Sequence, residues 1–378
     1  MSNEAKELKA LVLQGGGALG SYQAGAFEAL AEGGIGIDWL AGISIGAING
    51  AIICGNPPER RAERLAQFWR QTSGLLTAAP IAQDGTSLRL FNESSAAMTA
   101  GFGVPGFFTP RAPPLIPGWP YEPGELSLYD TASLKETLLR LVDFDLLNAG
   151  LIRYSIGATN ARNGNFQYFD TKYHKIGPEH VMASGALPPG LPPIEIDGEF
   201  YWDGGLVSNT PLQYVLDYEG DHEDICVFQI DLFSAVGELP KTMLEVAQRE
   251  KDIRYSSRTR LNTNVERRRC AVREAIHRFS ARLPPELRDD PDWRLVEDYA
   301  SPRATTIVHL IHRRALAESA SKDYEFSRYT MQRNWADGRM DVEKTLTHPN
   351  WIARTAPRGG VKVFDLTLSR EERECETG

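Results

Sequence analysis

The stretch "LQGGGALGSYQAG" at residues 13–25 places three consecutive glycines between an apolar run and a segment with helical spacing. The preceding "LKALVLQ" at 8–14 is predicted to form a buried strand. Apolar residues then recur on one face of a helix predicted over 19–31. A strand, a glycine turn and a helix in this order are typical of an α/β fold with a mainly parallel sheet.

The rest of the chain continues this pattern. "IDWLAGIS" at 37–44 predicts a second strand, and the almost entirely apolar 45–55 predicts a buried helix. "IEIDGEFYW" at 194–202 predicts a hairpin that turns at Asp197-Gly198. The remaining predictions are strands over 151–160, 164–171, 224–233 and 305–312; helices over 57–73, 130–143 with Asp130 as N-cap, and 324–338; a largely helical 240–300; and a polar tail.

Residues 80–126 differ in composition from the rest. They are dense in glycine, proline and aromatic residues and show little periodicity. A long irregular segment inside a compact domain is usually functional or mobile. Two interpretations stay open, a lid over an acyl-binding site carrying Phe102, Phe107, Phe108 and Trp119, or an ordered surface loop.

Composition limits the compartments and cofactors to consider. The 378 residues contain no run close to the ~20 apolar residues of a membrane span. The N-terminal apolar run is too short for a signal peptide, so we expect a cytoplasmic protein. Four cysteines lack C-x-x-C spacing, and seven histidines form no H-E-x-x-H motif. We therefore expect no disulfide framework, no metal site and no cofactor.

Charge argues against one class of partner. The net charge of −9 disfavours nucleic acid as a ligand. Residues 241–288 run against this average, with 13 Lys and Arg against 6 Asp and Glu. This basic segment is either a solvated helix face with internal ion pairs or a peripheral contact for an anionic membrane surface.

A serine motif follows the second predicted strand. Gly42, Ser44 and Gly46 form G-x-S-x-G between an apolar strand and an apolar helix. This context fits a nucleophile elbow, in which a strained turn exposes the serine hydroxyl and the flanking glycines avoid collisions. The alternative is that Ser44 only caps the helix.

The glycine-rich stretch suits the same chemistry. Amide N–H groups of Gly15, Gly16, Gly17 and Ala18 at a helix N-terminus would donate hydrogen bonds to the negative oxygen of a tetrahedral intermediate. Both turns follow strands, so in a parallel sheet they lie at the same edge.

A dinucleotide site is a rival interpretation of these glycines. Gly15, Gly17 and Gly20 satisfy G-x-G-x-x-G, and Asp38 follows at a suitable distance. A ribose-binding acid belongs at the end of the second strand, however, whereas Asp38 lies near its start. A nicotinamide-type oxidoreductase is therefore the less favoured hypothesis.

The base that would activate Ser44 has several candidates. Asp203 precedes Gly204 and Gly205, which would let the backbone pass close to the serine turn. The alternative is that Asp203 and Gly204 form an ordinary Asp-Gly turn. Asp170 and Asp231 end predicted strands and stay open as alternatives, and His309 or His312 would be needed for a histidine triad.

Together these motifs resemble the patatin-like phospholipases. The chain carries "GGGALG" at 15–20, "GISIG" at 42–46, "ASGALPPGLPP" at 183–193 and "DGG" at 203–205, in that order. The resemblance covers roughly 8–235. It implies a three-layer α/β/α sandwich with a mainly parallel sheet, Ser44 as nucleophile and Asp203 as base of a Ser–Asp dyad without histidine, and a metal-free acyl-enzyme mechanism on lipid esters.

One position departs from the family pattern. Leu19 stands where the family's glycine loop usually carries Arg or Lys, which puts headgroup electrostatics in doubt but leaves the backbone donors intact.

The resemblance also divides the chain. Residues 1–235 are predicted to be the catalytic domain. Residues 236–378 resemble a mostly helical extension of uncharacterised function found in one group of bacterial patatin-like proteins, with strand 305–312 as a candidate to join the main sheet. The expected partner is a lipid or acyl-ester substrate. A lipid-binding or regulatory protein without useful turnover is the alternative function.

Overall fold

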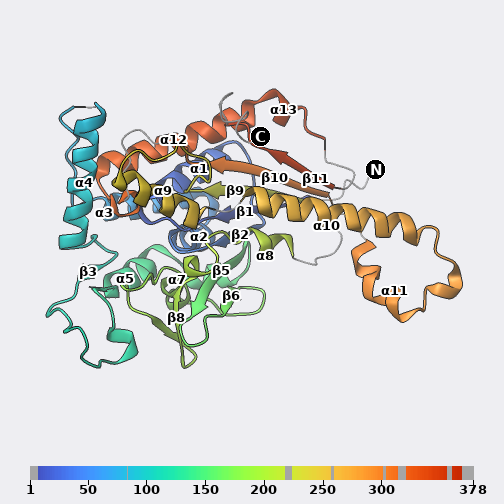
Figure 1. Ribbon diagram of the computed structural model, residues 1–378, viewed down its shortest axis with the longest axis horizontal. Helices are drawn as coiled ribbons and strands as arrows, with labels where there is room; N and C mark the ends of the chain where they lie inside the picture. Colours follow the sequence, from blue (N-terminus) through green and yellow to red (C-terminus); the bar gives the residue numbers. More distant parts are fainter. Residues whose placement is uncertain are drawn as a thin grey trace.

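The computed structural model describes residues 7–82, 84–217, 224–256, 259–300, 304–313, 321–355 and 360–367. Its centre is a nine-stranded sheet with the order β11-β10-β9-β1-β2-β5-β8-β7, in which β6 also pairs with β5 (Figure 1). From β11 to β5 the neighbouring strands run parallel, whereas β6, β7 and β8 pair antiparallel. The predicted α/β fold with a mainly parallel sheet is confirmed.

The strands of this sheet are β1 (Leu8–Leu13), β2 (Trp39–Gly42), β5 (Arg153–Asn160), β6 (Phe166–Asp170), β7 (Ile194–Ile196), β8 (Glu199–Asp203), β9 (Ile225–Asp231), β10 (Ala304–Ile311) and β11 (Gly360–Phe364). A separate short pair joins β3 (Thr109–Pro110) to β4 (Tyr129–Asp130).

The α-helices are α1 (Gly20–Glu32), α2 (Ile45–Cys54), α3 (Arg61–Thr72), α4 (Gly85–Phe102), α5 (Ala132–Leu141), α6 (Phe144–Asn148), α7 (Pro178–Ser184), α8 (Leu212–Leu216), α9 (Met243–Tyr255), α10 (Thr259–Ser280), α11 (Pro291–Val296), α12 (Arg328–Thr347) and α13 (Pro349–Ile352). Short 3₁₀ turns include η1 (Gly17–Leu19), η4 (Gly204–Leu206) and η7 (Lys322–Tyr324). Within the described residues no helix combines the length and apolar character needed to cross a bilayer.

Both faces of the sheet are buried, which is why its central strands read as continuous apolar runs. On β1, Leu11 and Leu13 join the larger core under α1, α2, α3, α5, α7 and α12, whereas Ala10 and Val12 join a smaller core under α8. This alternation is the two-residue period of a strand. The result is a helix–sheet–helix sandwich whose parallel strands all end at one edge.

The C-terminal part of the chain is built into the same sandwich. β10 and β11 extend the sheet beyond β9, and α12 runs along α1 (Figure 1). The two helices cross at glycines, because a Cβ on Gly338 would lie 2.1 Å from the carbonyl oxygen of Tyr22, and one on Gly25 would lie 2.0 Å from that of Trp335. The Tyr22 hydroxyl also donates to Asp341 at 2.8 Å. A domain boundary at 235/236 stays a prediction.

Three expectations from the sequence need correction. The supposedly irregular 80–126 contains the 18-residue helix α4, begun by Asp84, whose side chain accepts the Thr86 and Ser87 N–H groups. The helix predicted from Asp130 has Thr131 as its N-cap, although the Asp130 side chain accepts the Ala132 N–H. The polar tail includes β11, and its residues 368–378 lie outside the described part of the chain.

Candidate active site

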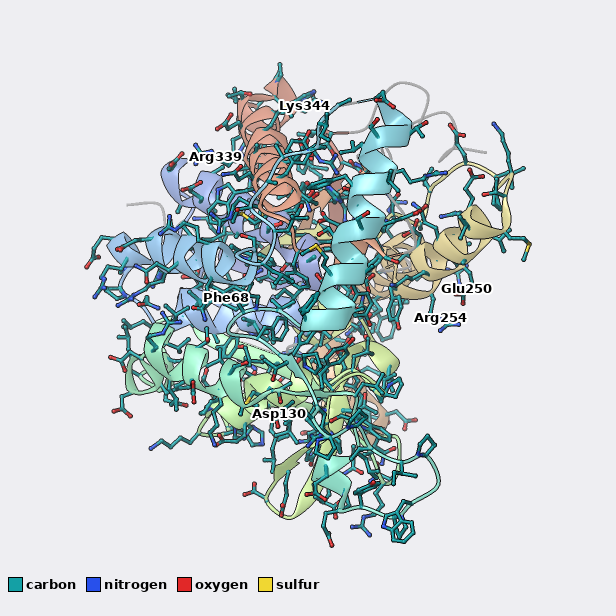
Figure 2. The ribbon with its side chains drawn as sticks, turned by 90° about the vertical axis from the view of Figure 1, so that its left-hand side faces the viewer. Phe68, Asp130, Glu250, Arg254, Arg339 and Lys344 are labelled. Atoms are coloured by element: carbon teal, nitrogen blue, oxygen red, sulfur yellow. The ribbon has the colours of Figure 1, made fainter. Side chains whose placement is uncertain are left out.

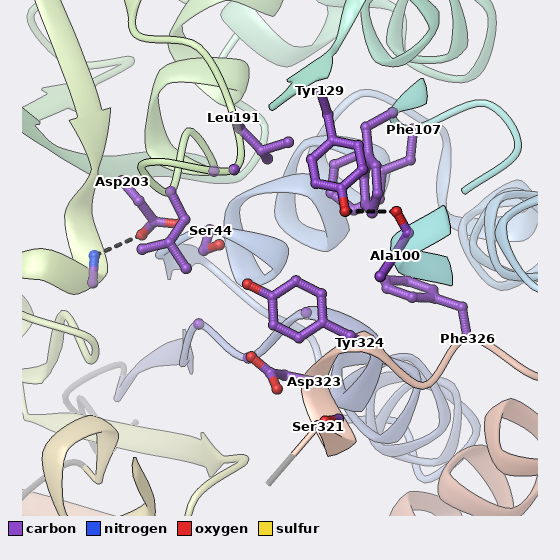
Figure 3. A pocket seen from close by; sticks show the side chains of 18 of the residues that line it. Ser44, Ala100, Phe107, Tyr129, Leu191, Asp203, Ser321, Asp323, Tyr324 and Phe326 are labelled. Carbon is purple, nitrogen blue, oxygen red and sulfur yellow. Dashed lines mark hydrogen bonds between the residues drawn. The ribbon is translucent and has the colours of Figure 1, made fainter. Parts of the chain in front are cut away.

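Ser44 occupies a strained turn between β2 and α2. Its φ of 53° and ψ of −121° are unusual for a residue with a side chain. The Ser44 N–H donates to the Ser184 hydroxyl at 3.0 Å, and Ser184 donates onward to the Gly157 carbonyl at 2.7 Å. Ser184 therefore holds the turn from α7, leaving the Ser44 hydroxyl facing a cavity (Figure 3).

The glycines around Ser44 are required by close backbone approaches. A Cβ on Gly42 would lie 2.5 Å from the Gly46 backbone, and one on Gly46 would lie 2.4 Å from the Leu13 carbonyl oxygen. One on Gly20 would meet Ile45 at 2.5 Å. These contacts let α1 and α2 pack closely enough to bring the two turns together.

Asp203 lies at the end of β8, next to Ser44 (Figure 3), and is 3% exposed. Burial raises the pKa of its carboxyl to about 7, against the lowering effect of hydrogen bonds with Ser44 and the Gly205 N–H. The glycines after it allow this placement, because a Cβ on Gly204 would lie 2.6 Å from the Gly157 carbonyl oxygen and 3.2 Å from Ile43 in the serine turn. The result is a buried carboxylate beside a half-buried hydroxyl.

The glycine loop lies at the same edge of the sheet. Gly15, Gly16 and Gly17 line the cavity together with Ser44 and Asp203. The Gly15 N–H already donates to the Asn209 carbonyl at 3.1 Å, which takes it out of the predicted donor set. The predicted oxyanion donors that remain are the amides of Gly16, Gly17 and Ala18, at the start of η1 and α1.

Leu19 does not line the cavity. It is 2% exposed and packs in the core, so the position that usually holds a family cation is apolar and buried.

The cavity has a volume of about 520 Å³ and is mostly apolar. Much of its apolar wall comes from α4, the segment after it, and the 187–191 turn. The apolar residues from these segments are Ala96, Ala97, Ala100, Phe107, Phe108, Leu128, Tyr129, Leu187, Pro188, Pro189 and Leu191. Phe107 and Phe108 are thus buried wall residues, whereas Phe102 and Trp119 are 70% and 65% exposed. Whether the 80–126 segment opens as a lid stays a prediction.

The other candidate bases are held elsewhere. Asp170 is occupied by Arg153, at 2.7 Å, and by the hydroxyls of Ser155 and Tyr214. Burial alone would raise the pKa of Asp170, but these hydrogen bonds lower it. Asp231 is buried on β9, where it accepts from Gln229. Neither carboxylate lines the cavity.

The histidines and Asp38 are also placed away from Ser44. Burial lowers the pKa of His309 on β10 to about 3, and the His312 ring lies tilted against Tyr22, with 5.0 Å between ring centroids. β9 and β1 separate β10 from β2. Asp38 accepts the Lys9 N–H at the amino end of β2, opposite the glycine loop, which argues against dinucleotide binding.

Several residues that shape the site carried no sequence signal. The Asn209 side chain donates to the carbonyls of Gly15 and Tyr255 at 3.1 and 2.9 Å. Gln14 donates to the same Tyr255 carbonyl and accepts the Leu232 N–H. These amides tie the glycine loop to α9. From still later in the chain, Ser321, Asp323, Tyr324 and Phe326 complete the cavity wall.

Comparisons with known proteins agree with this architecture. Residues 11–216 match the family model described as patatin-like phospholipase, and 253–358 match a second one described as patatin phospholipase. Lysophospholipase NTE1 of Meyerozyma guilliermondii is 25% identical over 221 residues, which cover 56% of this chain and 12% of that protein. Neuropathy target esterase sws of Drosophila willistoni is 45% identical over 67 residues, 18% of this chain and 4% of that one.

Among solved structures, VipD from Legionella pneumophila covers 89% of this chain and 67% of its own, with 16% identity and a TM-score of 0.37. The chain spans a small fraction of the length of the two curated relatives. The patatin-like phospholipase model nevertheless matches more than half of this chain, and the matched region contains the glycine loop, Ser44 and Asp203. The chain belongs to the patatin-like phospholipase family.

Proposed function

We propose that the protein is a serine acyl hydrolase that cleaves fatty-acyl esters of lipids. The observation that carries this proposal is the placement of Ser44, in a strained turn, beside a buried carboxylate with a pKa of about 7 in a largely apolar cavity. A carboxylate ionising near neutrality is suited to accept and return a proton. The apolar wall suits an acyl chain.

In the first step Asp203 accepts the Ser44 proton while Oγ attacks the ester carbonyl. The carbonyl oxygen becomes negative and receives hydrogen bonds from the amides of Gly16, Gly17 and Ala18, supported by the N-terminal end of α1. The carbon–oxygen bond to the alcohol then breaks, and the leaving alkoxide takes the proton from Asp203. The acyl group stays on Ser44.

In the second step Asp203 accepts a proton from water as the water attacks the acyl-enzyme. The oxyanion forms again at the same amides. When the intermediate collapses, the bond to Oγ breaks and Asp203 returns the proton to Ser44. A fatty acid is released, and no metal or redox group takes part.

Labelling with a fluorophosphonate, together with hydrolysis of nitrophenyl esters of short and long chain, tests the proposal. Ser44→Ala should abolish both, because the nucleophile is lost, whereas Ser280→Ala on α10 should retain both. If the Ser44 variant is labelled as strongly as the parent, another residue is the nucleophile. Vesicle binding by a parent protein that is never labelled would instead favour the lipid-binding alternative.

The rim of the cavity suits peripheral contact with a lipid surface. α4 and α9 stand beside each other on one side of the molecule (Figure 2), and both contribute to the cavity. Their exposed apolar side chains are Leu90, Phe102, Met243, Leu244, Val246 and Ile253. α9 has no buried residue at all. We propose that this rim rests on the membrane from which substrate enters.

The basic segment 241–288 contributes less to this contact than its composition suggests. Arg254 pairs with Glu250 at 2.5 Å and Arg278 with Glu274 at 3.5 Å, and Arg269 pairs with Asp217. These internal ion pairs favour the interpretation of a solvated helix face. A cytoplasmic location stays a prediction.

A further inference from the structure

One wall of the cavity is made by the C-terminal part of the chain. The η7 turn lies against the glycine loop, because a Cβ on Gly17 would come within 2.3 Å of the Asp323 carbonyl oxygen. Tyr324 extends from this turn toward Ser44, and Asp323 lies below it (Figure 3). This turn is therefore next to the position where the ester would bind.

Two reciprocal ion pairs fasten η7 to α9. Asp323 pairs with Lys251, and Lys322 pairs with Asp252 at 2.8 Å. The Asp323 and Lys251 side chains are only 12% and 20% exposed. The charge of Lys251 is thus compensated by a carboxylate that itself faces the cavity.

The described residues that line the cavity include three carboxylates, Glu93, Asp203 and Asp323, and no lysine, arginine or histidine. A phosphate placed there would lose its hydration and meet like charges without a compensating cation. Leu19, where a family cation is usual, adds none.

The same wall has neutral hydrogen-bond groups. Tyr255 and Tyr324 line the cavity. Burial, followed by the field of Asp323, raises the pKa of Tyr324 to about 12, so its hydroxyl stays a donor at neutral pH. Two phenols can hydrogen-bond an alcohol oxygen or hydroxyl without demanding charge.

We propose that the cavity selects esters whose leaving alcohol carries no negative charge near the ester, such as monoacylglycerols, and that the Asp323–Lys251 pair sets this selectivity. The proposal rests on the acyl-hydrolase function above and adds its substrate class. An anionic leaving group, such as glycerol phosphate, is rejected because the pair leaves no free cation for it.

The experiment compares monoacylglycerol with lysophosphatidate of the same acyl chain, each at low mole fraction in uncharged detergent micelles. For the parent protein we expect kcat/KM to favour monoacylglycerol by about tenfold or more, since a phosphate that loses its hydration in a cavity without a lining cation costs at least that factor. Equal values for the two substrates would overturn the proposal.

Two substitutions then test the ion pair. Asp323→Asn removes the carboxylate that pairs with Lys251 and should raise the lysophosphatidate-to-monoacylglycerol ratio of kcat/KM several-fold. Lys251→Met leaves Asp323 uncompensated and should lower the same ratio. A merely structural role would move both ratios in one direction, and that result would refute the assignment. Asp292→Asn, at an exposed position of α11, is the matched control and should leave the ratio unchanged.

Fluorophosphonate labelling of each variant separates this inference from the function beneath it. Labelled protein that hydrolyses both substrates without discrimination contradicts only the selectivity. Parent protein that is neither labelled nor active on either ester contradicts the acyl-hydrolase proposal, and the selectivity falls with it.

Discussion

As the proposed base, Asp203 has to be buried enough to hold a proton near neutral pH and yet remain able to release it. Its carboxyl has lost water at the end of β8, and the Ser44 hydroxyl and the Gly205 N–H replace only part of that hydration. In a dyad this single group does the work that a histidine and a carboxylate share in a triad. Its environment should therefore be visible in the pH dependence of both activity and stability.

The activity should rise with pH and level off above about pH 7, because only ionised Asp203 can accept the Ser44 proton. The measurement is kcat/KM for an uncharged nitrophenyl ester between about pH 5 and pH 9, with the rate of fluorophosphonate labelling as a second readout. Labelling should follow the same curve. A flat profile across neutrality would exclude Asp203 as the base.

The stability should change in the opposite direction. In the unfolded chain the carboxyl ionises near 3.8, whereas the folded protein keeps its proton until about pH 7. Between these values the folded state binds more protons, so its stability falls as pH rises, by up to about 4 kcal/mol.

Asp203→Asn removes this term, so the variant should lose less stability than the parent between about pH 5 and pH 8 while turnover falls by a factor of about 10³ or more. Urea unfolding at the two pH values measures the first effect and ester hydrolysis the second. Equal stability losses in parent and variant would show that the Asp203 carboxyl is not the group responsible.

At the residue scale, the sequence predicted candidate site residues where the chemistry requires particular residue types at fixed spacing. Ser44 and Asp203 stand in short motifs, and the structure places them beside each other. Hydrogen-bond partners were not predictable in this way. The letters "GGG" do not indicate that the Gly15 N–H donates to the Asn209 carbonyl. No sequence pattern indicates that the Ser184 hydroxyl accepts the Ser44 N–H either. Such contacts depend on three-dimensional approach over long sequence separations.

Among the elements, α1 and α12 form the closest helix crossing described here. Gly338 touches the backbone of α1 directly, so a methyl group at this position has to push the two helices apart. Gly338→Ala should therefore lower the free energy of unfolding by about 2 kcal/mol, despite the better helix propensity of alanine.

Gly101→Ala is the control for this prediction. Gly101 lies on α4 and has no atom within 4 Å of its missing Cβ, so alanine there should be neutral or slightly stabilising. Chemical denaturation of both variants gives the comparison. Equal stability of the Gly338 variant and the parent would mean that the crossing is looser than described.

Periodicity predicted most elements but not α4. The hairpin turn was specific because Asp197 and Gly198 both need positive φ, and they have values of 51° and 81°. α4 was missed because its turns are rich in small and polar residues and it runs directly into a glycine- and proline-rich segment. Its start is set by the Asp84 cap, and only two of its buried side chains, Leu88 and Ala96, are apolar, so no apolar periodicity marks the helix.

Considered as a whole, the molecule places its apolar rim and its cavity on one side. Leu90→Ser with Met243→Ser should weaken binding to uncharged phosphatidylcholine vesicles by about tenfold, because both side chains are more than half exposed at the rim. The matched control is Val272→Ser with Leu295→Ser, on α10 and α11. Flotation with vesicles measures binding.

Salt separates the two possible origins of this binding. Apolar contact should persist at high ionic strength, whereas attraction through the basic segment would be screened. Equal losses in the rim and control variants, or binding abolished by salt alone, would contradict a membrane contact through α4 and α9.

Strand 305–312 is expected from the sequence to join the main sheet, as β10 does, but the place of residues 321–326 in the cavity wall could not be predicted, because no motif links them to the glycine loop. They nevertheless complete the cavity, while β10 covers β9 and α12 covers α1. This arrangement also affects the chain while it is being synthesised. During synthesis the N-terminal half emerges first, with the edge of β9 unpaired and the surface of α1 uncovered, and both are prone to association with other chains. Association would be limited only once β10, β11 and α12 are made, and Ser44 and Asp203 are both synthesised before residues 321–326 complete the cavity around them.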